Sequence, residues 1–112
     1  MMDIREMKAG RELDELVMIK VMRWTKEVDH KPLPMWRDNN GFNVDHIARF
    51  FTPSVDMSAA WEIIEKMNSP YVIASTEDGD ESWVHFGDEA NAAIGTAPEA
   101  ICKAALLQME GK

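Results

Sequence analysis

The side chains of this chain that could do chemistry are three histidines, one cysteine and several acidic pairs, and their spacing matches no common catalytic or metal site. His30, His46 and His85 each lack a second histidine or a cysteine two to four residues away, which is the spacing that marks zinc sites. Cys102 is the only cysteine, so the chain can form neither an internal disulfide framework nor a Cys-Cys metal pair. We therefore expect no metal, no cofactor and no catalytic residue.

The acidic residues support the same conclusion. The run at 77–81 lacks the twelve-residue spacing of an EF-hand and is typical of a solvated turn. The pairs Asp14 with Glu15 and Glu62 with Glu65 are expected on the outward faces of helices, away from any cleft that acid–base catalysis would need. An enzyme is thus the least favoured class.

The segment 24–49 mixes aromatic rings with positively charged side chains. Tryptophan can stack on a base while arginine or lysine meets a phosphate, so a small anionic ligand of the nucleotide type fits this composition. The alternative, which we favour, is that Trp24 and Trp36 help close the core beneath a long loop. The candidate ligand- or partner-binding residues are Trp24, Trp36, Arg37, His46 and Arg49.

Three helices are expected to position these residues. Apolar side chains recur at helical spacing over residues 4–24, 54–67 and 96–111. Ser54 is expected to cap the second helix after Pro53. Gly10 is costly inside the first helix, which predicts either close packing there or a helix that begins at Arg11.

Residues 71–76 and 82–86 are predicted to form a β-hairpin around an acidic turn that contains Gly79. Both faces of this hairpin carry large apolar side chains, so we expect helices on both sides of it. The fold class is then α+β, an α/β/α sandwich in which a small antiparallel sheet is covered by three helices. Residues 88–95 are expected to be a connection.

The length of 112 residues predicts a single domain, 1–112, with one irregular region. That region is the loop 25–50, in which two prolines exclude a helix interior or a central strand. A turn at 38–41 predicts a short hairpin between residues 35–37 and 42–44 within the loop.

The net charge of −8 argues against nucleic-acid binding, because phosphate attraction requires a basic surface. Residues 1–52 are neutral in sum and residues 53–112 carry the whole excess of acid, so a small anion would favour the first half. The chain shows no signal-like apolar start and no apolar run of about twenty residues. We expect a cytoplasmic protein that does not bind membranes.

Three blocks of sequence resemble the phage ABA sandwich domain family, small proteins of phages and prophages. The blocks are Ala9-Gly10-Arg11-Glu12-Leu13-Asp14-x-Leu16-Val17 with Lys20-Val21-Met22-x-Trp24, Phe51-x-Pro53-Ser54-x-Asp56 with Ala59-Ala60-Trp61, and Thr96-Ala97-Pro98-x-Ala100-Ile101-Cys102-x-Ala104-Ala105-Leu106. The chain departs from the family pattern at Arg23, where a small residue, usually Gly, precedes tryptophan, and in the loop 25–49. The resemblance implies a layered α/β/α fold and a phage context, and it implies no activity.

These observations together favour a non-enzymatic phage or prophage accessory protein of the bacterial host cytoplasm that acts by protein–protein interaction. An unidentified protein partner and a homodimer are both compatible with this hypothesis. The alternative is a small-ligand binder that sequesters a nucleotide signal through the loop 25–50.

Overall fold

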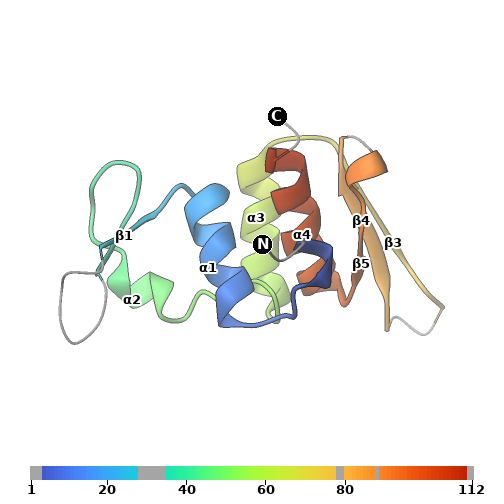
Figure 1. The fold of residues 1–112 in the computed structure, drawn as a ribbon, viewed down its shortest axis with the longest axis horizontal. Coiled ribbons are helices and arrows are strands. Elements are labelled where there is room, and N and C mark those ends of the chain that lie inside the picture. The colour runs from blue at the N-terminus through green and yellow to red at the C-terminus, as the bar shows by residue number, and fades with distance from the viewer. Residues whose placement is uncertain (1–3, 28–34, 78–79, 88, 111–112) are drawn as a thin grey trace.

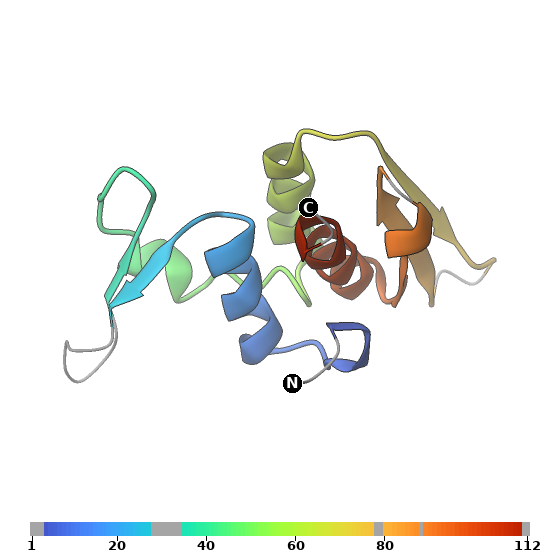
Figure 2. The same cartoon turned by 45° about the horizontal axis from the view of Figure 1, so that its top comes forward.

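The fold is a row of layers along one axis. The computed structural model describes residues 4–27, 35–77, 80–87 and 89–110. A three-stranded sheet lies at one end, helices α3 and α4 form the next layer, α1 follows, and a small β-hairpin with a short helix lies at the other end (Figures 1 and 2). The elements are η1 Ile4–Glu6, α1 Arg11–Lys20, β1 Thr25–Glu27, β2 Met35–Arg37, α2 Asp45–Ala48, α3 Met57–Met67, β3 Tyr71–Ser75, β4 Ser82–Phe86, η2 Glu89–Asn91, β5 Ala93–Gly95 and α4 Ala97–Glu110.

The sheet has the strand order β3-β4-β5 and is antiparallel throughout. The predicted hairpin is confirmed: Ile73 of β3 lies opposite Val84 of β4. The expected connection 88–95 is wrong in part, because it contains η2 and β5, and Ile94 of β5 pairs with Trp83. Three residues are too few to show strand periodicity, so β5 depends on the hydrogen bonds that β4 offers it. The α+β class with its small antiparallel sheet and helices is confirmed.

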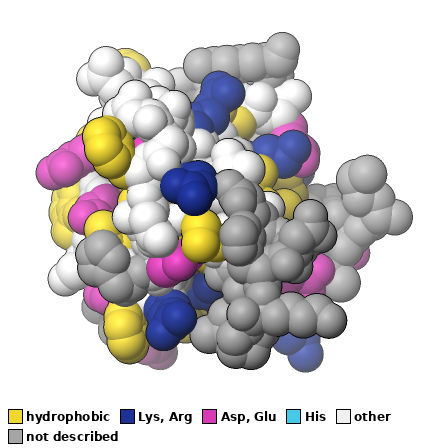
Figure 3. All heavy atoms as spheres, turned by 90° about the vertical axis from the view of Figure 1, so that its left-hand side faces the viewer, with side chains coloured by type: hydrophobic (Ala, Val, Ile, Leu, Met, Phe, Trp, Pro, Cys, Tyr) yellow, Lys and Arg dark blue, Asp and Glu magenta, His cyan; other side chains and the backbone are white. Residues whose placement is uncertain are grey.

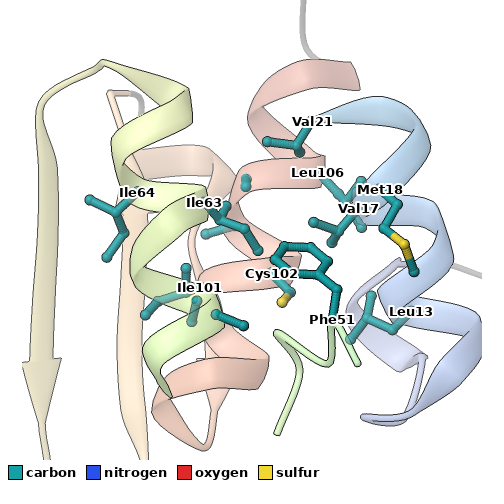
Figure 4. Packing of buried hydrophobic residues seen from close by; sticks show 14 of the residues in the cluster. Leu13, Val17, Met18, Val21, Phe51, Ile63, Ile64, Ile101, Cys102 and Leu106 are labelled. Atoms are coloured by element: carbon teal, nitrogen blue, oxygen red, sulfur yellow. The ribbon is translucent and has the colours of Figure 1, made fainter. Parts of the chain in front are cut away.

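Helix α4 forms the centre of the core. Residues 100–106 of α4 are all buried, because the sheet lies against one side of the helix and α1 against another. A helix enclosed in this way needs mostly small or apolar side chains, which its alanines provide. The one charged residue of this run, Lys103, donates to the Arg5 carbonyl and the Glu99 carboxylate. On the side of α1, Leu13, Val17 and Met18 lie close to Phe51 and Leu106 (Figure 4).

Helices cover only one face of the sheet. Val84 and Phe86 of β4 are fully buried and face α4, whereas Val72 and Ile94 on the opposite face are 44% and 60% exposed. The expectation of helices on both faces of the hairpin is therefore wrong. The physical reason is that α1 packs on α4 rather than on the sheet, which leaves the outward face without a helix among the described residues.

A buried polar clasp joins the start of α1 to the turn before α3. The Asp14 carboxylate, 1% exposed, accepts the Ser54 backbone N–H at 2.8 Å, and the Ser54 hydroxyl accepts the Gly10 backbone N–H at 2.9 Å. The sequence placed Asp14 on an outward face and Ser54 at a helix cap, and both expectations are wrong. The cap of α3 is Asp56, whose carboxylate accepts the Ser58 N–H at 3.0 Å.

The ends of α1 explain two unusual residues. The helix begins at Arg11, directly after Gly10 with its positive φ of 150°, so the longer helix expected over 4–24 is wrong. At the other end Arg23 has a φ of 65° and the Trp24 N–H bonds to the Met18 carbonyl at 2.9 Å. This is the left-handed helix end that favours glycine, which gives a physical reason for the glycine expected from the family pattern.

Candidate interaction surface of the distal module

The candidate site lies at the end of the molecule away from the sheet. We call residues 23–50 the distal module; the structure describes 23–27 and 35–50 of it. Its strands β1 and β2 pair antiparallel, with Lys26 opposite Trp36. The predicted pairing of 35–37 with 42–44 is reduced to one bridge between Arg37 and Asn43. Strand β1 pairs with β2 instead, so the described parts of the loop contain more regular structure than the turn residues suggest.

A tight turn and α2 complete the module. The Asp38 carboxylate accepts the N–H groups of Asn40 and Phe42, both at 2.9 Å, and Gly41 adopts a φ of 87°. The Asp45 carboxylate, in the first turn of α2, accepts the backbone N–H of Trp36. Two acidic side chains therefore shape this loop by bonding to its own backbone.

The structure gives both predicted tryptophans packing roles. Trp36 is 3% exposed, with the Lys26 ammonium 5.8 Å from its ring centroid. The half-buried Trp24 ring lies 5.2 Å from that of Phe51 at a tilt of 53°. A ring as buried as Trp36 offers no free face on which a ligand could stack.

The predicted cations differ in how they are held. The half-buried Arg37 guanidinium donates to the Gly41 carbonyl at 3.0 Å and contacts the Met35 sulfur at 3.3 Å. Arg49 follows α2 and is exposed. His46 lies in α2, but its side chain and the whole of His30 and Lys31 are outside the described residues. Arg49 is therefore exposed to solvent, whereas Arg37 stabilises the turn by its hydrogen bond to Gly41.

Sequence reasoning missed three exposed apolar side chains of the module. Phe42, Ile47 and Phe50 are 69%, 45% and 80% exposed. The sequence doublet Phe50-Phe51 could have indicated one of them. Neighbouring residues on a helical turn face different directions, so both rings are not expected in the core, and Phe51 is the buried one, at 4% exposed. Figure 3 shows this end of the molecule, where hydrophobic, basic and acidic side chains lie side by side. Exposed aromatic rings beside arginine are enriched where proteins bind one another.

A shallow hollow lies where the module joins the end of α1. It has a volume of about 570 Å³ and is lined by Ile19, Arg23, Trp24, Thr25, Lys26 and Asn39. The Lys26 ammonium is already paired with the Glu15 carboxylate at 2.6 Å. Arg23 is exposed at the rim, so it is the cation that a small anion in this hollow would meet.

The described residues show neither a reactive thiol nor a cluster of metal ligands. Burial raises the pKa of the Cys102 thiol, and the nearby charges of Asp14 and Glu99 raise it further, so this cysteine is an unreactive neutral thiol. Within the described ranges no cluster of three or more His, Cys, Asp or Glu side chains could hold a metal ion. In that same part of the chain, no helix is long and apolar enough to cross a membrane.

The fold and this surface define a small α+β domain whose exposed features suit contact with other molecules. A family model described as the phage ABA sandwich domain matches residues 15–106, so the chain belongs to that family. The fold is similar to a phage protein from Bacillus cereus ATCC 14579 solved by crystallography at 2.0 Å, with a TM-score of 0.64 and 18% identity over 94% of this chain and 93% of that one. A search of curated proteins finds no match.

Proposed function

We propose that this phage-family protein is a non-enzymatic accessory protein that acts by binding a protein partner through the distal module, in the cytoplasm of the bacterial host. The observation that carries the proposal is the exposure of Phe42, Ile47 and Phe50 in one module, in which the exposed Arg49 directly precedes Phe50 in sequence. Aromatic rings and arginine dominate the energetics of protein interfaces. The module contributes three exposed large apolar side chains, two of them phenylalanines, and apolar area gathered on one surface is typical of binding sites.

The other features agree with a binding role. The thiol of Cys102 is buried, and two acidic side chains of the module, Asp38 and Asp45, bond to backbone N–H groups of their own loop. The chain charge of −8 disfavours a nucleic-acid partner. A phage or prophage protein that works by contact needs a stable scaffold and an exposed surface, and this chain provides both.

The test is capture of partner proteins from a lysate of bacteria in which the phage or prophage that encodes this chain is expressed. The full-length chain is immobilised as wild type, as the double variant Phe42→Ser/Phe50→Ser, and as the control Val55→Ser, which replaces a 63% exposed side chain outside the module. We expect a protein that the wild type and the control retain and the double variant loses. Truncating two interface aromatics should weaken binding at least about tenfold. If the double variant captures the same proteins as the control, the distal module is not the binding surface.

A second candidate function rests on the hollow at Arg23 and Trp24. An open hollow with a half-buried indole and an arginine at its rim could hold a small anion such as a nucleotide signal, which the protein would sequester. A thermal-shift series with phosphate and with mono-, di- and cyclic nucleotides tests this. A ligand at about a hundred times its Kd adds about 2.7 kcal/mol of stability. No shift, or a shift that survives Arg23→Ala as it survives Arg49→Ala, rejects the hollow.

A further inference from the structure

The end of the molecule opposite the distal module carries a second exposed apolar surface. We call it the sheet end; it is the outward face of β3, β4 and β5, formed by Val72, Ala74, Trp83, His85 and Ile94. Val72 and Ile94 are 44% and 60% exposed, and Trp83 and His85 are half-buried with their rings in edge contact at 5.0 Å. Because the layers stack along the long axis, this face and the distal module point in opposite directions (Figures 1 and 2).

The segment that forms the sheet end is acidic in sequence. Residues 71–96 contain no lysine or arginine, and they contain six acidic residues. The six are Glu77, Asp78, Asp80, Glu81, Asp88 and Glu89. A partner of this face must therefore bring apolar side chains together with positive charge, because a second acidic surface would be repelled.

The distal module has the complementary character. Residues 23–50 contain five Lys and Arg against four Asp and Glu, so this segment is slightly positive in a chain of net charge −8. Two of those acids, Asp38 and Asp45, already bond to backbone N–H groups, whereas Arg23 and Arg49 are exposed. Phe42 and Phe50 supply exposed apolar area at the same end.

The size of the two ends suits a contact between copies. The molecule measures 45 × 28 × 28 Å, so an end-on contact offers a cross-section of 28 × 28 Å. Taken as a circle of that diameter, the cross-section is on the order of 600 Å², somewhat below the roughly 800 Å² per partner of a standard specific interface. An end-to-end contact can thus bury an area at the lower end of the range for specific complexes.

We propose that the protein associates head to tail, with the distal module of one copy docked on the sheet end of the next. Opposite charge favours this arrangement, and a symmetric contact between two sheet ends would bring together two segments with six acidic residues each. Such a heterologous contact forms rings or open chains instead of closed two-fold dimers. The inference rests on the proposed function in that it uses the same module, and it names a second copy of this chain as a partner.

The test is light scattering on full-length chains with one end blocked at a time. The module variant is Arg49→Glu/Phe50→Ser and the sheet variant is Val72→Lys/Ile94→Lys; all four positions are exposed, so circular dichroism should report unchanged folding. We expect the mean mass of the wild type and of Val55→Ser to rise with concentration at about 50 mM salt and to fall at about 500 mM. Each variant alone should be a monomer. Mixed in equal amounts, the two variants should form a complex of twice the monomer mass, because one intact module remains to meet one intact sheet end.

Three results would overturn the inference. The first is a wild type that stays monomeric at every concentration. The second is a dimer that the sheet variant abolishes and the module variant keeps, which would show a symmetric sheet contact. The third is an equal mixture of the two variants that stays monomeric. If self-association is absent while Phe42→Ser/Phe50→Ser still loses a captured partner, the inference fails and the proposed function stands.

Discussion

Replacing Asp14 should cost more stability than its position on a charged helix suggests. The sequence reads Arg-Glu-Leu-Asp-Glu, and in the structure Glu12 is exposed while Asp14 is 1% exposed. The Asp14 carboxylate accepts the Ser54 N–H at 2.8 Å, and Ser54 is itself fully buried. This bond ties α1 to the turn that leads from the distal module into α3.

The cost can be worked from the two groups involved. Asp14→Ala removes the acceptor and leaves the Ser54 N–H buried without a partner, which costs roughly 2–3 kcal/mol for a bond to a charged group. Asp14→Asn keeps an oxygen in place and should cost about 1 kcal/mol or less. Glu12→Ala, the matched control on the same helix, should stay within about 0.5 kcal/mol.

Urea unfolding followed by circular dichroism gives the free energy of unfolding of each variant. In thermal melts a domain of this size shifts by about 4 °C for each kcal/mol, so Asp14→Ala should melt roughly 8–12 °C below the wild type. The order expected is wild type and Glu12→Ala, then Asp14→Asn, then Asp14→Ala. An Asp14→Ala protein as stable as Glu12→Ala would show that the clasp contributes nothing and would refute the reasoning.

Two further predictions concern single residues. Arg23→Gly should raise the free energy of unfolding by about 0.5–1 kcal/mol, because Arg23 has a φ of 65° that glycine adopts without strain. The control Lys20→Gly, in the last turn of α1, should lower the free energy of unfolding. An Arg23→Gly protein less stable than the wild type would contradict this explanation. Cys102 should react with a thiol reagent only after unfolding. Because burial raises its pKa in the folded state, its contribution to stability is complete below the unfolded pKa of about 9 and is lost as pH rises above it. Between about pH 8 and pH 10 the wild type should therefore lose about 1.4 kcal/mol more than Cys102→Ala, and equal losses would show that the thiol is not shielded.

Helices α3 and α4 were predictable because their signals are local, whereas the four-residue α2, Asp45–Ala48, lies within the expected loop and was missed. Apolar spacing and the break at Asn68 fix α3, whose end adopts the left-handed conformation that Asn tolerates. The Thr96-Ala97-Pro98 start marks α4. Gly10 left two alternatives, close packing at Gly10 within a longer helix or a helix that begins at Arg11, and α1 begins at Arg11. The polar clasp was not predictable, because nothing near Asp14 in sequence indicates that Ser54, forty positions away, supplies its partner.

The sequence indicated a segment that could bind a partner, and it did not indicate which side chains of that segment face water. Aromatic rings and positive charge drew attention to 25–50, yet burial divides equivalent residue types: Phe51 lies in the core and Phe50 is 80% exposed. Pairing sets this division, since β1 pairs with β2 and Asp45 fixes α2 on β2. Which ring faces water depends on contacts that a single sequence does not contain.

The error at the sheet carries the main lesson for function. Apolar side chains on both faces of 71–86 were taken to require a helix on each face, since exposed apolar area costs roughly 25 cal/mol for each Å² left in water. The structure places α4 on one face and leaves Val72 and Ile94 on the other exposed. The same physical argument then applies between molecules instead of within one. A face patterned for burial that no α-helix of the described chain covers is a reason to look for the surface that covers it. The acidic residues of the same segment favour a surface of opposite charge.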